Sequence, residues 1–417
     1  MPTDFIFEAL KEMLHVALQT APFWAPVGLL LLAAEMWKLY INKLHLQSLK
    51  WTMLEVRIPK DVFKTPLAME LVLINAFHQG GGVGTWFHRW WLGALPATFS
   101  LEIASLGGKV YFFIRTQPKF KQLIESQIYS QYPQAEINEV DDYVDAIVAP
   151  HESGSEWKMW GTEFKLATKD VYPIKTYIDY GLDKATSLDE EQKIDPITTM
   201  LEHMGSITPN EQMWFQIMIR ITTKRFGVAG EWFGKQDWTK SAEEEIKKIM
   251  SKPMFAPEKD DKGKSKAPTA MNLSTAQKEK IDAIERSIQK PAFDVGIRGI
   301  YLAKGDSFNA INMTALTGAF KQYGSANLNG FRATNVTDVD IGIIHDPFKR
   351  IVPRKKMEMF NAYRARGYFY HPYKLPPFIL NAEELATIYH FPGRVSETPS
   401  FARIEALKAE PPVNLPT

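Results

Sequence analysis

The sequence contains no cysteine in its 417 residues. This absence excludes disulfide bonds, thiolate nucleophiles, iron–sulfur clusters and zinc sites with thiolate ligands. A strong net charge is missing too, because 49 Lys and Arg residues nearly balance 48 Asp and Glu residues and leave a formal charge of +1. Without a global positive field, any contact with nucleic acid requires a local basic patch.

Motifs of common catalytic sites are missing as well. The 9 histidines show no H-x-H, H-x-x-H or H-E-x-x-H spacing, so no two of them are preset as metal ligands on one element. The Gly-Lys pairs that begin at 108, 234 and 263 lack the upstream glycine of a G-x-x-x-x-G-K phosphate loop. No G-x-S-x-G elbow for a nucleophilic serine is present. The sequence therefore predicts no catalytic, cofactor-binding or metal-binding residue.

One long apolar run is present, from Ala21 to Ile41, behind an amphipathic segment at residues 1–20. Its length is that of a helix that crosses the hydrocarbon core of a bilayer. Acidic residues outnumber basic ones before the run, which disfavours a cleaved secretory signal. Basic residues such as Lys43 and Lys50 follow it, so the positive-inside rule predicts a single-pass protein of the inner (cytoplasmic) membrane with most of the chain in the cytoplasm. A buried or peripheral amphipathic helix is the alternative.

The pattern after this anchor predicts the α+β class. Residues 51–150 read as strand, helix, strand, strand, helix, strand, which is the order of a ferredoxin-like (βαββαβ) module. Gly107 and Gly108 separate two of these strands, as in a hairpin turn. A second module of this kind is predicted at 160–336, with its first strand at 170–179.

The second module is interrupted by a predicted helical hairpin between its central strands. The tract at 254–272 inside this insertion is rich in Pro, Gly, Ser and Lys and is typical of disorder. Residues 337–417 then form a basic, proline-rich tail with a short helix at 381–390. In that helix Asn381 and Glu384 have the spacing of a capping box, so its acidic residues are predicted to cap the helix and not to catalyse.

The short helix is also a candidate docking element. Its apolar face consists of Leu385, Ile388 and Tyr389. The proline-rich sequence around it has little capacity to fold alone. We therefore expect the helix to dock, either on the second module of this chain or on a neighbouring subunit.

Aromatic residues are concentrated in the loop at 85–93. Tryptophan and arginine stack on nucleic-acid bases, and tryptophan also favours the membrane interface, where Trp24, Trp37 and Tyr40 of the apolar run are expected to lie. Covering the open end of the first module is the structural alternative. The candidate interface or membrane-surface residues of this loop are Trp86, His88, Arg89, Trp90 and Trp91.

Basic residues are concentrated at the start of the tail. Such a cluster can contact phosphates or an acidic partner, and a solvated face is the alternative. The candidate residues are Lys349, Arg350, Arg354, Lys355 and Lys356.

Long stretches of the chain resemble a known group of proteins. The resemblance is carried by "PLAMELVLINAFHQ", "FSLEIASLGGKVYFFIRTQPKFKQLIESQIYSQYP", "DVYPIKTYIDYGLD", "EQKIDP", "EQMWFQIMIR" and "NAEELATIYHFPG…AEPPVNLP". These resemble an uncharacterised membrane-anchored family of candidate-phyla bacteria. That family is similar to the N-terminal regions of conjugation-type DNA-transfer ATPases of the FtsK/HerA class in type IV secretion systems.

The resemblance implies a place between a membrane helix and a hexameric motor, and it favours a neighbouring subunit as the surface for the short helix. The sequence ends about where such motors begin their nucleotide-binding core. We therefore expect a membrane-anchored, non-catalytic platform or accessory subunit of a translocation ATPase, with homo-oligomerisation left open. Two other functions stay open: a nucleic-acid-binding module of a conjugation apparatus, and an enzyme with a site between the two modules.

Overall fold

The computed structural model divides into two units, which we describe separately. Unit 1 comprises residues 1–49 and 82–96, and unit 2 comprises residues 50–81 and 97–417. The predicted disordered tract at 254–272 and Lys349 lie outside the described residues. The described residues are 2–59, 64–78, 84–152, 154–183, 195–222, 226–227, 235–251, 273–338 and 350–392.

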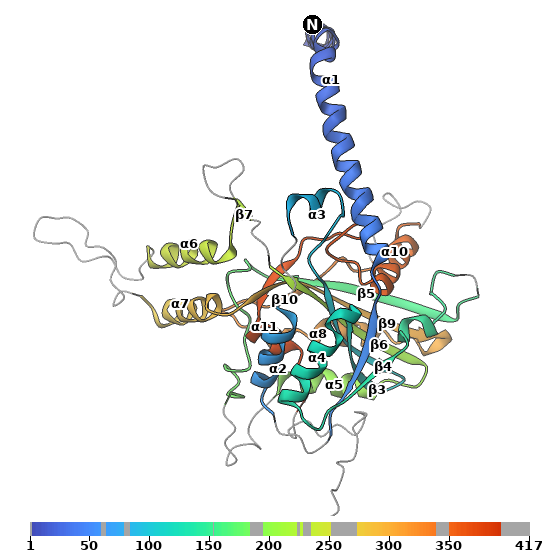
Figure 1. Cartoon of the computed structure of the whole chain (residues 1–417), viewed down its shortest axis with the longest axis vertical. Coiled ribbons are helices and arrows are strands. Elements are labelled where there is room, and N and C mark those ends of the chain that lie inside the picture. Colours follow the sequence, from blue (N-terminus) through green and yellow to red (C-terminus); the bar gives the residue numbers. More distant parts are fainter. Residues whose placement is uncertain are drawn as a thin grey trace, which may run out of the picture. The chain divides into compact units, whose positions relative to one another are not determined.

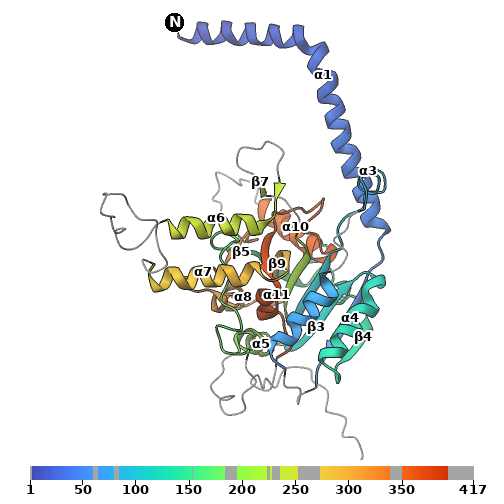
Figure 2. The same cartoon turned by 60° about the vertical axis from the view of Figure 1, so that its left-hand side comes forward.

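Unit 1 is built on one long helix, α1 (Pro2–Ser48), with the short helix α3 (Trp86–Trp90) beside it. Figure 2 shows that α1 bends part-way along its length. Pro22 and Pro26 lie inside the helix, and proline removes a backbone hydrogen bond and kinks a helix. The stretch Leu18–Ser48 is long and apolar enough to cross a membrane, and 6% of its most apolar window is buried. The structure therefore contains the apolar helix that the sequence predicts.

Unit 2 is built around an antiparallel sheet of nine strands in the described part of the chain (Figure 1), which confirms the α+β class. The strand order is β10-β5-β9-β6-β2-β3-β1-β4, and β11 pairs with β9. A short pair, β7 (Phe226–Gly227) and β8 (Lys235–Gln236), is separate. The strands of the main sheet are β1 (Thr52–Arg57), β2 (Phe99–Leu106), β3 (Lys109–Thr116), β4 (Glu136–Val140), β5 (Trp157–Leu166), β6 (Glu211–Ile221), β9 (Ala292–Lys304), β10 (Phe331–Thr334) and β11 (Phe378–Asn381).

The two halves of this sheet repeat one arrangement. Apart from α3 in the first half and the insertion after β6 in the second, the chain order in each half is strand, helix, strand, strand, helix, strand. In the sheet the fourth strand of each half lies beside the first, followed by the third and then the second. The halves join where β2 pairs with β6, with Leu101 opposite Ile217. Gly107 and Gly108 form the predicted hairpin turn, both with positive φ. The helices of the halves are α2 (Pro66–Val72), which continues as a π-helical turn (Leu73–Phe77), α4 (Pro118–Gln131), α5 (Pro196–Ser206) and α8 (Ala310–Gly318).

The predicted first strand of the second half is wrong. Residues 170–179 form no strand, because Pro173 offers no backbone N–H and the Thr176 N–H donates to the side chain of Asp179 at 2.8 Å. The strand in this position of the repeat is β5, at 157–166, which pairs with β9 on one side and β10 on the other.

The predicted insertion follows β6 in the chain as two helices, α6 (Trp238–Met250) and α7 (Thr275–Ile288). They pack on each other through Ala242 and Ile284. Ser274 and Gln277 form a capping box at the start of α7.

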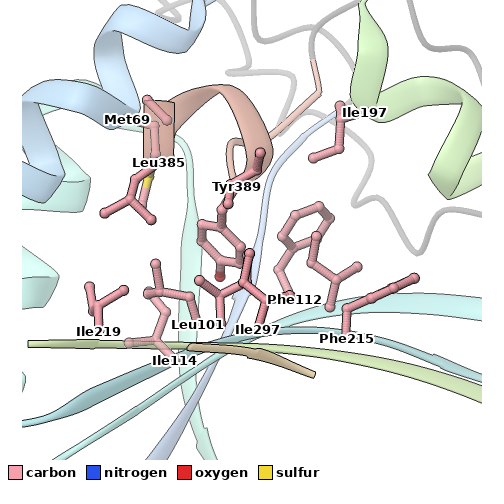
Figure 3. Close-up of a cluster of buried hydrophobic side chains, with 14 of the residues drawn as sticks. Met69, Leu101, Phe112, Ile114, Ile197, Phe215, Ile219, Ile297, Leu385 and Tyr389 are labelled. Atoms are coloured by element: carbon pink, nitrogen blue, oxygen red, sulfur yellow. The ribbon is translucent and has the colours of Figure 1, made fainter. Parts of the chain in front are cut away.

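The main core lies between the sheet and the helices α2, α4, α5, α8 and α11 (Ala382–Ile388). Figure 3 shows side chains of the strands, such as Ile114 and Ile297, pointing at Leu385 and Tyr389 of the C-terminal segment. The opposite face of the sheet is covered by α10 (Ile351–Ala365) and by a 3-10 turn at Tyr143–Ala146. The second face also buries polar and charged side chains of the strands, among them Glu102 and Arg298.

Candidate membrane-contact site

The aromatic loop of the sequence is folded against the C-terminal part of α1. The Trp37 indole N–H donates to the Trp90 carbonyl at 2.8 Å, and the rings of Trp37 and Trp91 meet edge to face with centroids 5.7 Å apart. The Lys38 ammonium lies 5.9 Å from the Trp90 ring centroid. These contacts fix α3 at one level of the long helix.

The turn after α3 explains how the chain comes so close to α1. Gly93 has a φ of +61°, a conformation that residues with a side chain rarely adopt. A Cβ at this position would overlap the Ile41 carbonyl, so glycine is required there for two reasons. At the start of α3, the Thr85 Oγ1 and His88 Nδ1 atoms lie 2.9 Å apart, which is a hydrogen-bond distance.

The exposed aromatic side chains around this contact, together with Leu92, form a surface that we call the aromatic platform. They are arranged in order, because Trp86 stacks on Trp90 at 6.3 Å and Phe87 stacks on Trp91 at 6.5 Å. The platform consists of Trp37 (41% exposed), Tyr40 (56%), Trp86 (65%), Phe87 (54%), Trp91 (54%) and Leu92 (53%).

The structure therefore brings together most of the loop residues that the sequence singled out, and it adds others. Trp86, Trp90 and Trp91 lie in one cluster, whereas Phe87 and Leu92 were missed. The i to i+4 spacing of Trp86 to Trp90 and of Phe87 to Trp91 is the signal that identifies both pairs once the loop is read as a helical turn.

The basic cluster lies at the start of α10. Arg350 is the N-cap residue and is exposed. Arg354 is paired with Glu358 at 2.7 Å, one helical turn later. Lys356 lies 3.9 Å from Asp338. Part of the predicted charge is thus neutralised within the chain, which weakens the cluster as a contact for phosphate.

The predicted docking of the short helix on a neighbouring subunit is wrong. Leu385, Ile388 and Tyr389 are each 0% exposed, inside the main core of unit 2. The reason is a long-range strand pairing. Residues 378–381 form β11, which pairs with residues 292–295 of β9, and this pairing places the helix that follows β11 against the sheet. The Tyr389 hydroxyl donates to the Phe113 carbonyl at 3.2 Å.

The capping box of this helix is confirmed, and its glutamate also accepts a hydrogen bond from a distant part of the chain. The Glu384 N–H donates to the Asn381 side chain at 2.8 Å, and the Asn381 N–H donates to Glu384 at 2.9 Å. Glu384 also accepts the Ile174 N–H at 2.9 Å. Burial raises the pKa of Glu384 to about 8, although both N–H donors favour the ionised form.

The histidine that follows the helix is also buried in the core. Its Nε2 lies 3.0 Å from Asp195, the N-cap residue of α5, and its Nδ1 lies 2.9 Å from the Ala386 carbonyl. Burial lowers the pKa of His390, but the charge of Asp195 and the hydrogen bonds to Asp195, Ala386 and Thr387 together outweigh burial and raise that pKa above its ordinary value.

A row of polar side chains crosses the opposite face of the sheet. Glu102, Gln216, Arg298 and Glu163 stand directly opposite one another on β2, β6, β9 and β5. Gln216 donates to Glu102 at 3.3 Å, and Arg298 donates to Gln216 at 3.2 Å and to Glu163 at 2.9 Å. All four are essentially buried, and we call them the polar row. The sequence did not reveal it, because only the register of four strands brings these residues together.

The residues that end α10 cap the polar row. Arg366 has a φ of 52° and places its guanidinium 2.9 Å from Glu102, with Asp142 on its other side. Tyr143 donates to Glu102 at 2.7 Å and lies 2.6 Å from the Tyr363 hydroxyl. Burial alone would raise the pKa of Glu102, but Arg366 holds it below its ordinary value.

An open hollow of about 680 Å³ lies beside this network, at the β1 and β4 edge. Arg115 lines it and is flanked by Arg366, and burial together with that like charge lowers its pKa to about 10. Among its lining residues the hollow combines this cation with the carboxylates of Glu139, Asp141, Asp142 and Asp145. In the described part of the chain no group of three or more His, Asp or Glu is placed to hold a metal ion.

Comparison with known proteins identifies one family. The family described as Domain of unknown function (DUF8128) matches residues 43–403. The match begins just after the apolar run and covers most of the chain. No curated protein matches the sequence.

Proposed function

The chain belongs to the DUF8128 family, and we propose that it acts as a membrane-anchored, non-catalytic platform. The observation that carries this proposal is α1, whose stretch Leu18–Ser48 is apolar and almost wholly exposed. A soluble protein rarely leaves so long an apolar surface in water. A bilayer is the environment in which that surface is stable.

The chemistry of unit 2 supports a structural role for its body. Among its fully buried charges, Glu102, Arg298 and Glu163 are paired with one another or with Arg366. Charges paired in this way fix a geometry but have little freedom to bind or transform a substrate.

We also infer that each half of the sheet is a ferredoxin-like module, and the support is the strand order of each half together with its two helices.

The orientation and partner are further parts of the proposal. Lys43 and Lys50 follow the apolar run and favour a cytoplasmic location for unit 2 at the inner membrane. The proposed partner is a motor ATPase of a type IV secretion-like system. Its support is the sequence resemblance to regions that flank such motors.

Membrane fractionation tests the anchor. We expect the full chain to stay in the membrane after carbonate extraction, and unit 2 to be digested by protease only when the cytoplasmic side is accessible. Leu30→Arg combined with Leu31→Arg should release the protein, because each arginine costs about 3 kcal/mol at the centre of a span. Ile311→Arg in unit 2 is the matched control, since Ile311 and Leu30 are both 70% exposed.

Affinity purification from native membranes tests the partner. Recovery of a motor ATPase with the full chain, and its loss in the Leu30→Arg/Leu31→Arg variant, is the expected result. Extraction of the unaltered protein by carbonate would contradict the anchor. Stable membrane insertion without any co-purified motor would contradict the partner alone.

A further inference from the structure

The aromatic platform of unit 1 lies at one end of the apolar part of α1. We propose that α3 is an interfacial element that lies in the headgroup layer of the bilayer and sets the depth of the α1 span. The partner that this surface fits is a lipid surface with anionic headgroups. This inference rests on the proposed membrane anchoring and adds a site to it.

The position of α3 along α1 is the first support. Its contacts reach Trp37, Lys38 and Ile41, where the apolar run ends. A helix crosses the hydrocarbon core in roughly 20 residues. A span that ends near Ile41 therefore begins near Ala21, within the apolar stretch Leu18–Ser48 of α1. Figure 2 shows α3 beside the C-terminal part of α1.

The chemistry of the platform is the second support. Indole rings combine an apolar body with an N–H donor and are enriched where hydrocarbon meets water. Trp86 and Trp91 are more than half exposed, as is Phe87, so their rings are available to a surface outside unit 1. Lys38 and Lys43 lie at the same end of α1 and suit anionic phosphates.

The rigidity of the attachment is the third support. The hydrogen bond from Trp37 to Trp90 and the tight turn at Gly93 couple α3 to α1. The depth of the platform in the bilayer is therefore coupled to the depth of the α1 span. An α3 that tilts out of the headgroup layer would have to pull α1 with it.

Site-directed fluorescence tests the inference in the full chain. Because the sequence has no cysteine, a single Cys can be introduced at Phe87, at Leu92, at Leu30 in the span, or at Ile311 in unit 2, and labelled with NBD. The labelled proteins are reconstituted in vesicles of phosphatidylcholine and phosphatidylglycerol. Lipids brominated near the headgroup or deep in the chain then act as quenchers.

We expect loss of fluorescence at 87 and 92 with the shallow quencher, at Leu30 with the deep quencher, and at Ile311 with neither. Quenching at Leu30 without quenching at 87 and 92 would overturn the inference and leave the anchor intact. Absence of quenching at Leu30 would overturn the anchor itself. Labels at 87 and 92 that are shielded from both lipid and aqueous iodide would overturn the inference, because a protein would then cover the platform.

A further variant removes the hydrogen bond that attaches α3 to α1 and keeps the aromatic rings of the platform. Trp37→Phe deletes the donor to the Trp90 carbonyl, so shallow quenching at 87 should fall and the balance of deep and shallow quenching at Leu30 should shift, because α3 no longer fixes the depth of the span. Trp24→Phe, elsewhere on α1, is the matched control and should change neither signal. Equal quenching at 87 in the Trp37→Phe variant and the unaltered chain would show that α3 reaches the headgroups without its attachment to α1, and would overturn its role in setting depth.

Discussion

The two faces of the unit 2 sheet achieve burial in opposite ways. One face packs its apolar side chains against five helices, with Leu385 and Tyr389 near the centre (Figure 3). The other face buries the polar row under the end of α10, with Arg366 against Glu102. Apolar packing tolerates substitutions that conserve volume, whereas a buried charge pair loses stability when either partner is removed. Apolar packing stabilises both faces, and the polar row adds a constraint on the register of the strands.

Removing the cap of the polar row should have the largest effect. Arg366→Met leaves Glu102 buried without its guanidinium, and breaking a buried pair costs about 3–5 kcal/mol. Urea unfolding in detergent measures the change. Adding Glu102→Gln to Arg366→Met should recover part of the loss, because the unpaired charge is then gone. A double variant no more stable than Arg366→Met would show that the charge is not the cause.

Truncation in the apolar face should have the next largest effect. Leu385→Ala removes a fully buried side chain from the main core and should cost about 3 kcal/mol in the same assay. Ile311→Ala is the control, because Ile311 is 70% exposed and its truncation should change stability by less than about 0.5 kcal/mol. If Leu385→Ala matched this control, the short helix would not belong to the core.

The two faces should also respond to pH with opposite sign. The folded pKa of Glu384, about 8, exceeds its ordinary value of 4.5, so the folded state holds a proton that the unfolded chain releases. Stability from Glu384 is then present at low pH and lost as pH rises from about 4.5 to 8. His390, whose pKa is also raised, acts in the same sense. Glu384→Gln should flatten this slope, measured as unfolding free energy against pH.

Glu102 on the other face has a lowered pKa, so its contribution is present above the ordinary value and is lost as pH falls through the lowered one. Glu102→Gln should therefore reduce the loss of stability in acid and leave the slope above neutral pH unchanged. An acid slope identical to that of the unaltered chain would contradict the pairing with Arg366.

The outer surface of α10 should contribute least. Arg354 is largely exposed and pairs with Glu358 one turn away, so Arg354→Ala should change stability by no more than about 0.5 kcal/mol. The contrast with Arg366→Met, on the inner side of the same segment, isolates burial as the cause. A large loss for Arg354→Ala would remove that contrast.

Local features were the ones that the sequence could predict. The capping box at Asn381 and Glu384 and the hairpin turn at Gly107 depend on residues close in the chain, and both are present. The α+β class and the apolar helix followed from periodicity and composition alone. In each of these cases the deciding interaction lies within a few residues.

Features that depend on distant pairing could not be predicted in the same way. The short helix is buried because β11 pairs with β9, which lies far away in the sequence. The apolar pattern of 170–179 resembles a strand, but no strand of the sheet pairs there, and β5 occupies that position of the repeat. The polar row requires four strands to be in register before any of its residues has a partner.

The junction of β2 with β6 has a consequence for dividing the chain into fragments. A fragment that ends at residue 150 would expose β2 along its 8 residues, with backbone donors and acceptors unpaired. It would also carry Glu102 without Arg366, which comes from a much later part of the sequence. Such a fragment invites another copy to complete its sheet edge to edge. Self-association of an isolated half would therefore report on a severed strand pairing and not on the oligomeric state of the intact protein.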